Sequence, residues 1–125
     1  MTARFEYGIP PTSHVLGAMN DSVVKYVDGV CDMLEIDVVS IISHKRNRPL
    51  ADLRHVLMFV LRTKFNMTYN EIGSFFHRNH ATVIHAENKI KTLIEANQID
   101  FFLGQCLQAA DDIYNEQWGQ NYKIH

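Results

Sequence analysis

The sequence predicts an all-α fold of about six helices in one domain. Apolar residues recur at spacings of three and four in several segments, which is the period of an α-helix. Residues that cap helix N-termini, such as Asp37 and Thr68, stand just before these segments, and no run has the alternation of a strand. The chain of 125 residues is long enough to bury a core without disulfides or metals.

The N-terminal part is expected to hold an irregular lead-in and one helix. Residues 1–19 include two prolines and two glycines, which favour irregular structure. From Asn20 onward the pattern becomes helical, with capping candidates at residues 20–22, so a helix is expected over about residues 22–35. Its apolar face consists of Val23, Val27, Val30, Cys31 and Leu34.

Two further helices are expected on either side of a basic loop. Asp37 can cap a short helix over residues 38–43, with Val39 and Ile42 as its apolar face. The loop HKRNR follows and ends at Pro49, which suits the first turn of a helix. That helix is expected over residues 50–65, leaving Arg54 and Arg62 available to solvent or phosphate. Its buried residues are expected to be Leu53, Val56, Leu57, Val60 and Leu61.

The next segment has the order of elements of a helix-turn-helix. Thr68 and Glu71 form a capping box that opens a short helix to about Phe76, with Ile72 and Phe75 inward. A turn at residues 77–78 leads to a helix over residues 80–96, which Asn79 can cap. The buried stripe of this helix is expected to be Val83, Ala86, Ile90, Leu93 and Ile94. The alternative is an ordinary capped surface helix within a helical bundle.

The last segment is predicted to be an amphipathic helix over about residues 100–117. Its apolar residues are Phe102, Leu103, Cys106, Leu107, Ala110, Ile113 and Tyr114. The domain organisation expected from these patterns is a lead-in over 1–19, a helix-turn-helix domain over 20–96, and this C-terminal helix within 97–125.

Charge is segregated along the chain, although the formal net charge is only -2. Residues 44–64 carry six lysines and arginines against a single acid, Asp52, whereas residues 1–43 and 97–125 are acidic. A basic middle between acidic ends indicates a polyanionic partner, with a solvated basic face as the alternative.

In a helix-turn-helix the first residues of the second helix point into the major groove. The outward positions there are Asn79, His80, Ala81, Thr82, His85 and Lys89, whose side chains can contact base edges or phosphate.

The ordered segments VCDMLEIDVVSIISHKRNR, TYNEIGSFF and RNHATVIHA resemble the C-terminal DNA-binding domain of the bacterial replication initiator DnaA. The resemblance covers about residues 27–95. Its most specific element is the family signature Arg-Asp-His-(Ser/Thr)-Thr-Val-x-His-Ala, which stands here at residues 78–86. It implies an all-helical fold of the DnaA C-terminal or Trp-repressor-like type that binds double-stranded DNA at a short asymmetric site.

The resemblance also implies roles for particular residues. Arg46 is matched to an arginine of the basic loop that enters the minor groove, with Arg48 as the competing candidate. The major-groove set consists of Arg78, Asn79, His80, Ala81 and Thr82. The phosphate contacts consist of Lys45, Arg54, Arg62 and Lys89.

The chain departs from the family pattern at the turn. The family has Phe-Gly-Gly-Arg-Asp-His, whereas this chain has Phe76-His77-Arg78-Asn79-His80, one residue shorter and without glycine. Asn79 replaces an aspartate suited to accepting from a cytosine amine, and Ala81 replaces a hydroxyl residue. We therefore carry over duplex binding and not the family's recognition sequence.

No Gly-x-x-x-x-Gly-Lys-(Ser/Thr) motif occurs, so we expect the DNA-binding part of the initiator without its ATPase module. Such a domain suits a repressor, an origin-binding accessory protein or a competitor for an initiator's sites, in replication or transcription control. We expect no enzyme activity and no cofactor.

Metal binding is the main alternative for the histidines. His77, His80 and His85 lie close together in sequence, but 80 and 85 are five apart and do not share a helical face. No cysteine lies nearby to complete a tetrahedral set, so no metal site is expected. Packing under the turn is the alternative role of His85.

A protein-interaction module is the second class of function. The acidic C-terminal segment is rich in aromatic residues: Phe101, Phe102, Tyr114, Trp118 and Tyr122. These residues cover the core or form a surface for a homodimer or a replication protein through residues 100–122. A domain that kept the fold but binds protein in place of DNA is the alternative to DNA binding.

Composition indicates a cytoplasmic setting. Cys31 and Cys106 are the only cysteines and form no Cys-x-x-Cys pair, which favours a reducing compartment. No stretch approaches the ~20 apolar residues of a membrane span, and the N-terminus lacks a secretory apolar region. We expect a nucleoid-associated protein of a bacterium, or a phage protein in its host's cytoplasm, with no membrane partner.

Overall fold

The computed structural model describes the backbone of residues 14–119 and the side chains of residues 21–117. All secondary structure in this range is helical, which confirms the predicted all-α class. The elements are α1 (His14–Met33), α2 (Val38–Ile42), α3 (Arg48–Thr63), α4 (Tyr69–Phe76), α5 (His80–Glu95), α6 (Phe101–Tyr114) and a terminal π-helical turn, η2 (Asn115–Gly119). None of the described helices has the length and apolar character needed to cross a membrane.

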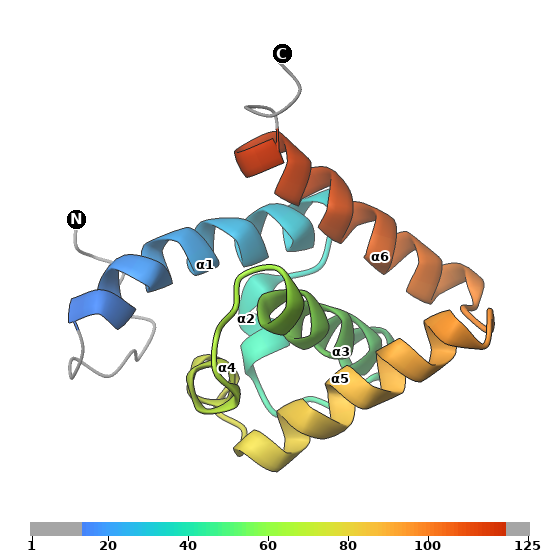
Figure 1. The fold of residues 1–125 in the computed structure, drawn as a ribbon. Coiled ribbons are helices and arrows are strands. Elements are labelled where there is room, and N and C mark those ends of the chain that lie inside the picture. Colours follow the sequence, from blue (N-terminus) through green and yellow to red (C-terminus); the bar gives the residue numbers. More distant parts are fainter. Residues whose placement is uncertain (1–13, 120–125) are drawn as a thin grey trace.

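Helix α3 is the central element of the fold. Figure 1 shows it nearly end-on, with α1, α6, α5 and α4 arranged around it and α2 behind. Most of its side chains are buried because neighbours lie on nearly every side. All five residues predicted for its buried face are buried, and Pro49 lies in its first turn as expected.

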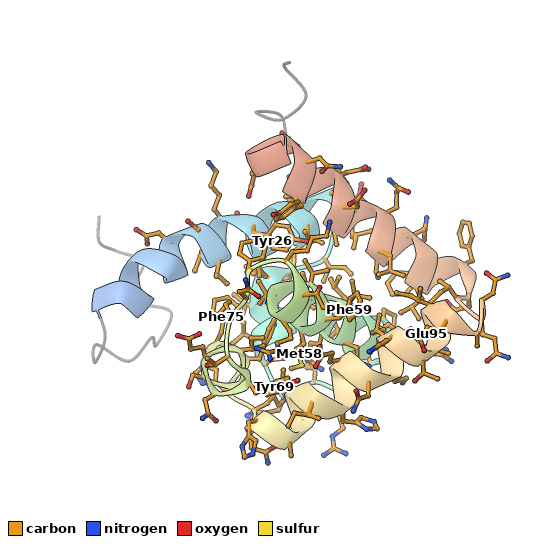
Figure 2. The ribbon with its side chains drawn as sticks, viewed as in Figure 1. Tyr26, Met58, Phe59, Tyr69, Phe75 and Glu95 are labelled. Atoms are coloured by element: carbon orange, nitrogen blue, oxygen red, sulfur yellow. The ribbon has the colours of Figure 1, made fainter. Side chains whose placement is uncertain are left out.

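Large side chains from several helices fill the space around α3. Figure 2 shows Tyr26 of α1, Met58 and Phe59 of α3 and Phe75 of α4 directed toward this region. The ring of Tyr26 is fully buried, and its hydroxyl donates to the Ala110 carbonyl of α6 at 2.8 Å. This hydrogen bond ties the N-terminal helix to the C-terminal helix across the core.

Helix α1 begins earlier than predicted. It starts at His14, so the expectation of an irregular lead-in to residue 19 is wrong for residues 14–19, and residues 1–13 lie outside the described range. The capping candidates at residues 20–22 lie inside the helix. Capping residues therefore misled the prediction, because their side chains are also tolerated on the solvent side of a helix.

Three details of the predicted core are also wrong. Val39 is 66% exposed, and Ile41 is the buried residue of α2. Ile94 is 44% exposed near the end of α5, where the helix leaves the core. Arg54, expected at the surface, is only 6% exposed.

The C-terminal helix α6 buries most of its predicted apolar face, including Leu103, Cys106 and Ile113. Of its aromatic residues, Tyr114 makes edge contacts with Tyr26 and Phe65, whereas Phe101 is 81% exposed. Trp118 and Tyr122 lie outside the described side chains. The aromatic segment thus contributes partly to the core and partly to the surface.

Candidate DNA-binding surface

Helices α4 and α5 form the helix-turn-helix predicted from the sequence. The capping box is present, with Glu71 N donating to Thr68 Oγ1 at 3.1 Å and Thr68 N donating to Glu71 Oε1 at 2.8 Å. Ile72, Phe75 and Phe76 of α4 and Val83 and Ala86 of α5 are buried. The apolar faces of both helices are fixed in the core, so the start of α5 has a defined direction.

The turn between the helices depends on two backbone features. His77 ends α4 in the left-handed conformation, with φ 59° and ψ 42°. The chain then folds back, so that Arg78 N donates to the Gly73 carbonyl at 2.8 Å. A Cβ atom added to Gly73 would lie 2.5 Å from the Arg78 carbonyl oxygen, well inside any tolerated contact. Gly73 therefore allows the close approach that sets the angle of α5.

Asn79 caps α5 as predicted. Its Oδ1 accepts from Thr82 N at 3.0 Å and from Thr82 Oγ1 at 3.2 Å. His80 and Ala81 are exposed in the first turn of α5, and Thr82 is half-buried. The N-terminus of α5 thus presents amide, imidazole, methyl and hydroxyl groups, but Asn79 Oδ1 and Thr82 Oγ1 are already hydrogen-bonded to each other.

The Ser43 carbonyl joins the base of the basic loop to the helix-turn-helix. It accepts from Arg54 Nη2 at 3.0 Å and from Arg78 Nη2 at 2.8 Å. Arg54 also donates to Ile41 O at 2.7 Å and to Ser40 O at 3.1 Å. A buried guanidinium therefore satisfies the Ile41 and Ser43 carbonyls at the end of α2 and gives the Ser40 carbonyl a further donor besides Ser43 N.

Arg78 is half-buried and spans the two parts of the surface. Besides Ser43 O, it donates to Phe76 O at 2.7 Å. Burial lowers the pKa of the Arg78 guanidinium, and the charge of nearby Arg46 lowers it further. The charge effect means that Arg46 of the basic loop lies near Arg78 at the turn.

In the basic loop, Lys45 and Arg46 are exposed to solvent. Arg48, the competing candidate for minor-groove insertion, stands at the start of α3 with its side chain 75% exposed. It pairs with Asp52 at 3.5 Å and with Asp100 at 3.2 Å, whereas Arg46 keeps an exposed side chain beside the turn. The geometry therefore favours Arg46 over Arg48 as the arginine available to DNA.

Of the remaining candidate DNA-binding residues, two are exposed to solvent and one forms contacts within the protein. His85 and Lys89 are exposed on α5, so the alternative that His85 packs under the turn is wrong. Arg62 is half-buried, donates to Met67 O at 3.0 Å and lies 4.3 Å from the ring centre of Tyr69. Its contacts hold the connection between α3 and α4.

His55 was missed by sequence reasoning. It is half-buried on α3, and its Nδ1 is buried without a hydrogen-bond partner. Burial lowers its pKa, and the positive charge of Lys89 lowers it further, so the ring is neutral at pH 7. Its position directly before the apolar run over residues 56–61 was the only signal for its burial.

The described residues offer little for other chemistry. Among residues 21–117, no three histidine, cysteine, aspartate or glutamate side chains are placed to share a metal ion. Cys31 and Cys106 are buried free thiols, and burial raises the pKa of each to about 12. A thiol with so high a pKa is a poor nucleophile at neutral pH.

Comparison with known proteins matches residues 25–90 to the family described as bacterial DnaA protein helix-turn-helix. The chain is 35% identical over 69 residues to the chromosomal replication initiator protein DnaA of Mycoplasma pneumoniae, covering 55% of this chain and 16% of that protein. It is 33% identical over 88 residues to the DnaA of Onion yellows phytoplasma, covering 70% of this chain and 17% of that protein.

A third similar protein is the DnaA of Dechloromonas aromatica, which is 38% identical over 81 residues, covering 63% of this chain and 17% of that protein. The chain thus spans less than a fifth of the length of these relatives. The family match covers more than half of the chain and includes both helices of the helix-turn-helix. This chain therefore belongs to the bacterial DnaA helix-turn-helix family.

Proposed function

We propose that this domain binds double-stranded DNA with sequence preference, in the control of replication or transcription. The first turn of α5 lies in the major groove, and Arg46 enters the adjacent minor groove. One observation carries the proposal: the Ser43 carbonyl, held by Arg54 and Arg78, fixes the basic loop beside the start of α5. A rigid link of this kind sets the spacing between two grooves of a duplex.

The side chains divide by their surroundings. We assign base-edge contacts to His80, Ala81 and the side-chain nitrogen of Asn79, because these groups stand at the exposed start of α5. Lys45, His85 and Lys89 are exposed and suited to phosphate or groove-edge contacts. Arg54, Arg62 and Arg78 support this surface through backbone carbonyls.

A selection of bound duplexes from a random-sequence library tests this function directly. We expect an asymmetric motif of about nine base pairs, because one helix and one adjacent arm read a site without two-fold symmetry. A palindrome would show that two copies bind as a symmetric repressor. No enrichment over the input library would contradict sequence-specific binding.

The second candidate function is a protein-interaction module with little or no DNA binding. Phe101, 81% exposed at the start of α6, favours it. A second copy of the chain or a replication protein would contact the segment over residues 100–122, which contains Phe101. Mass measurement in solution separates the homodimer from the monomer, and a chain indifferent to DNA at low salt would favour this candidate over DNA binding.

Replacing Arg46 by alanine should weaken binding to the selected site by about 2 kcal/mol, or roughly thirtyfold in Kd. The slope of log K against log salt should become shallower by about 0.9, because one cation fewer displaces counterions. Titrations at several salt concentrations measure both effects. Wild-type affinity in this variant would contradict the minor-groove role of Arg46.

Replacing Asn79 by aspartate should alter base preference without loss of stability. Aspartate caps a helix about as well as asparagine, so the bond to Thr82 N is retained. The amide donor becomes a carboxylate acceptor, which favours a cytosine amine over an adenine edge. Repeating the selection with this variant should change the preferred base at one position. An unchanged motif would place Asn79 outside base recognition.

A further inference from the structure

We propose that Asp100, at the start of α6, restrains Arg48 from contacting DNA and thereby limits the affinity of the surface. The inference rests on the proposed DNA binding. It makes Asp100 a positioning residue, because it acts through Arg48 and not through contact with DNA. The acidic C-terminal helix would then limit the DNA affinity that Arg48 of the basic loop contributes, although Arg48 and Asp100 are 52 residues apart in sequence.

The contacts around Arg48 carry this inference. Arg48 Nη2 donates to Asp100 Oδ2 at 3.2 Å, and Arg48 Nε lies 3.5 Å from Asp52 Oδ2. Two carboxylates therefore share one guanidinium, although the Arg48 side chain is 75% exposed. By contrast, the exposed Arg46 two residues earlier is near enough to Arg78 for its charge to lower the pKa of that guanidinium. Nearly adjacent arginines are thus held in opposite electrostatic surroundings.

Asp100 has two functions that a substitution can separate. Its Oδ1 accepts from Leu103 N at 2.8 Å and caps α6, while its Oδ2 accepts from Arg48. Asparagine is as good an N-cap as aspartate, because its side-chain carbonyl can accept the same bond. Asp100→Asn therefore keeps the helix start and removes one of the two negative charges that hold Arg48.

The restraint has a measurable consequence for binding. A guanidinium paired with two carboxylates displaces fewer counterions from DNA than one paired with Asp52 alone. We expect Asp100→Asn to bind the selected duplex about two- to fivefold more tightly, the range of an exposed ion pair. The salt slope should steepen by up to about 0.9. Thermal unfolding should match the wild type, which shows that the cap is retained.

A double-mutant cycle with Arg48→Gln distinguishes restraint of Arg48 from a general loss of negative charge. If Asp100 acts through Arg48, Asp100→Asn should have no effect on affinity in the Arg48→Gln background. Asp112→Asn is the matched control, because Asp112 is exposed on the same helix and contacts Gln108 instead. It should leave the affinity within about 1.5-fold of the wild type, since its charge is remote from Arg48 and screened by salt.

Three results would overturn the inference: unchanged or weaker binding by Asp100→Asn, an equal gain in the Arg48→Gln background, or an equal gain from Asp112→Asn. The wild type and Arg46→Ala are titrated alongside. If these two differ while Asp100→Asn matches the wild type, the proposed function stands and this inference fails. A wild-type chain that does not bind DNA at low salt overturns both.

Discussion

Replacing Arg54 by methionine should lower the free energy of unfolding by about 4 kcal/mol. The buried guanidinium donates to Ser40 O, Ile41 O and Ser43 O at 2.7–3.1 Å. Hydrogen bonds to a charged donor contribute about 1.5–3 kcal/mol each, and methionine would remove all three while filling similar space. Ser43 O keeps a donor in Arg78, and Ser40 O keeps Ser43 N at 3.2 Å and Ser43 Oγ at 2.7 Å, so the largest loss is at Ile41 O.

Urea denaturation of the purified chain measures this loss. Arg46→Met is the matched control, because it makes the same replacement on an exposed loop residue and should change stability by less than about 0.5 kcal/mol. The Arg54 variant should also lose DNA affinity, since the basic loop loses one of its two anchors. Stability within about 1 kcal/mol of the wild type would show that the carbonyls find other partners.

The burial of Arg54 is a feature that the sequence pattern did not predict. Its place on α3 was predicted correctly, but it was expected at the surface, because arginine is rarely buried without a partner. Its partners are backbone carbonyls at the end of α2, in a different helix. A pattern of side chains along one helix carries no information about carbonyl groups that another helix leaves open.

Structural features formed by residues close together in sequence, in contrast, were predicted well. The caps at Asp37, Thr68 and Asn79 are all present, because each bond joins residues two or three apart in sequence. The buried face of α3 also follows from its period. The features that were missed, such as the Ser43 carbonyl between two arginines and the Arg48–Asp100 pair, join residues far apart in sequence. Only the packed structure brings them together.

Gly73 is a further residue whose role was not predicted, although the sequence carries a signal for it. Glycine inside a short helix is unfavourable by about 1 kcal/mol relative to alanine, so it usually has a packing reason. Here the reason is the turn: the Arg78 carbonyl oxygen would lie 2.5 Å from a Cβ at position 73. The atom that would have to move is backbone, and it belongs to the segment that positions Asn79 and α5.

Replacing Gly73 by alanine should therefore destabilise the domain by about 3 kcal/mol, the upper end of the usual cost of overpacking. The reason is that Arg78 N and the Gly73 carbonyl could no longer approach to 2.8 Å, so the turn would open and α5 would change direction. We expect affinity for the selected duplex to fall even at temperatures where the variant is folded. Thermal unfolding and DNA titration measure the two effects separately.

Gly104→Ala is the matched control for this substitution. Gly104 lies inside α6, and a Cβ there would meet only Ile99 Cγ2 at 3.7 Å, an ordinary contact. The same change should stabilise the domain by about 0.5–1 kcal/mol, because alanine is the better helix former. Opposite signs at two helical glycines would show that the close approach at the turn, and not helix propensity, determines the cost at Gly73. A stabilised Gly73 variant would mean that the turn adopts another path, and the direction proposed for α5 in the major groove would have to be abandoned.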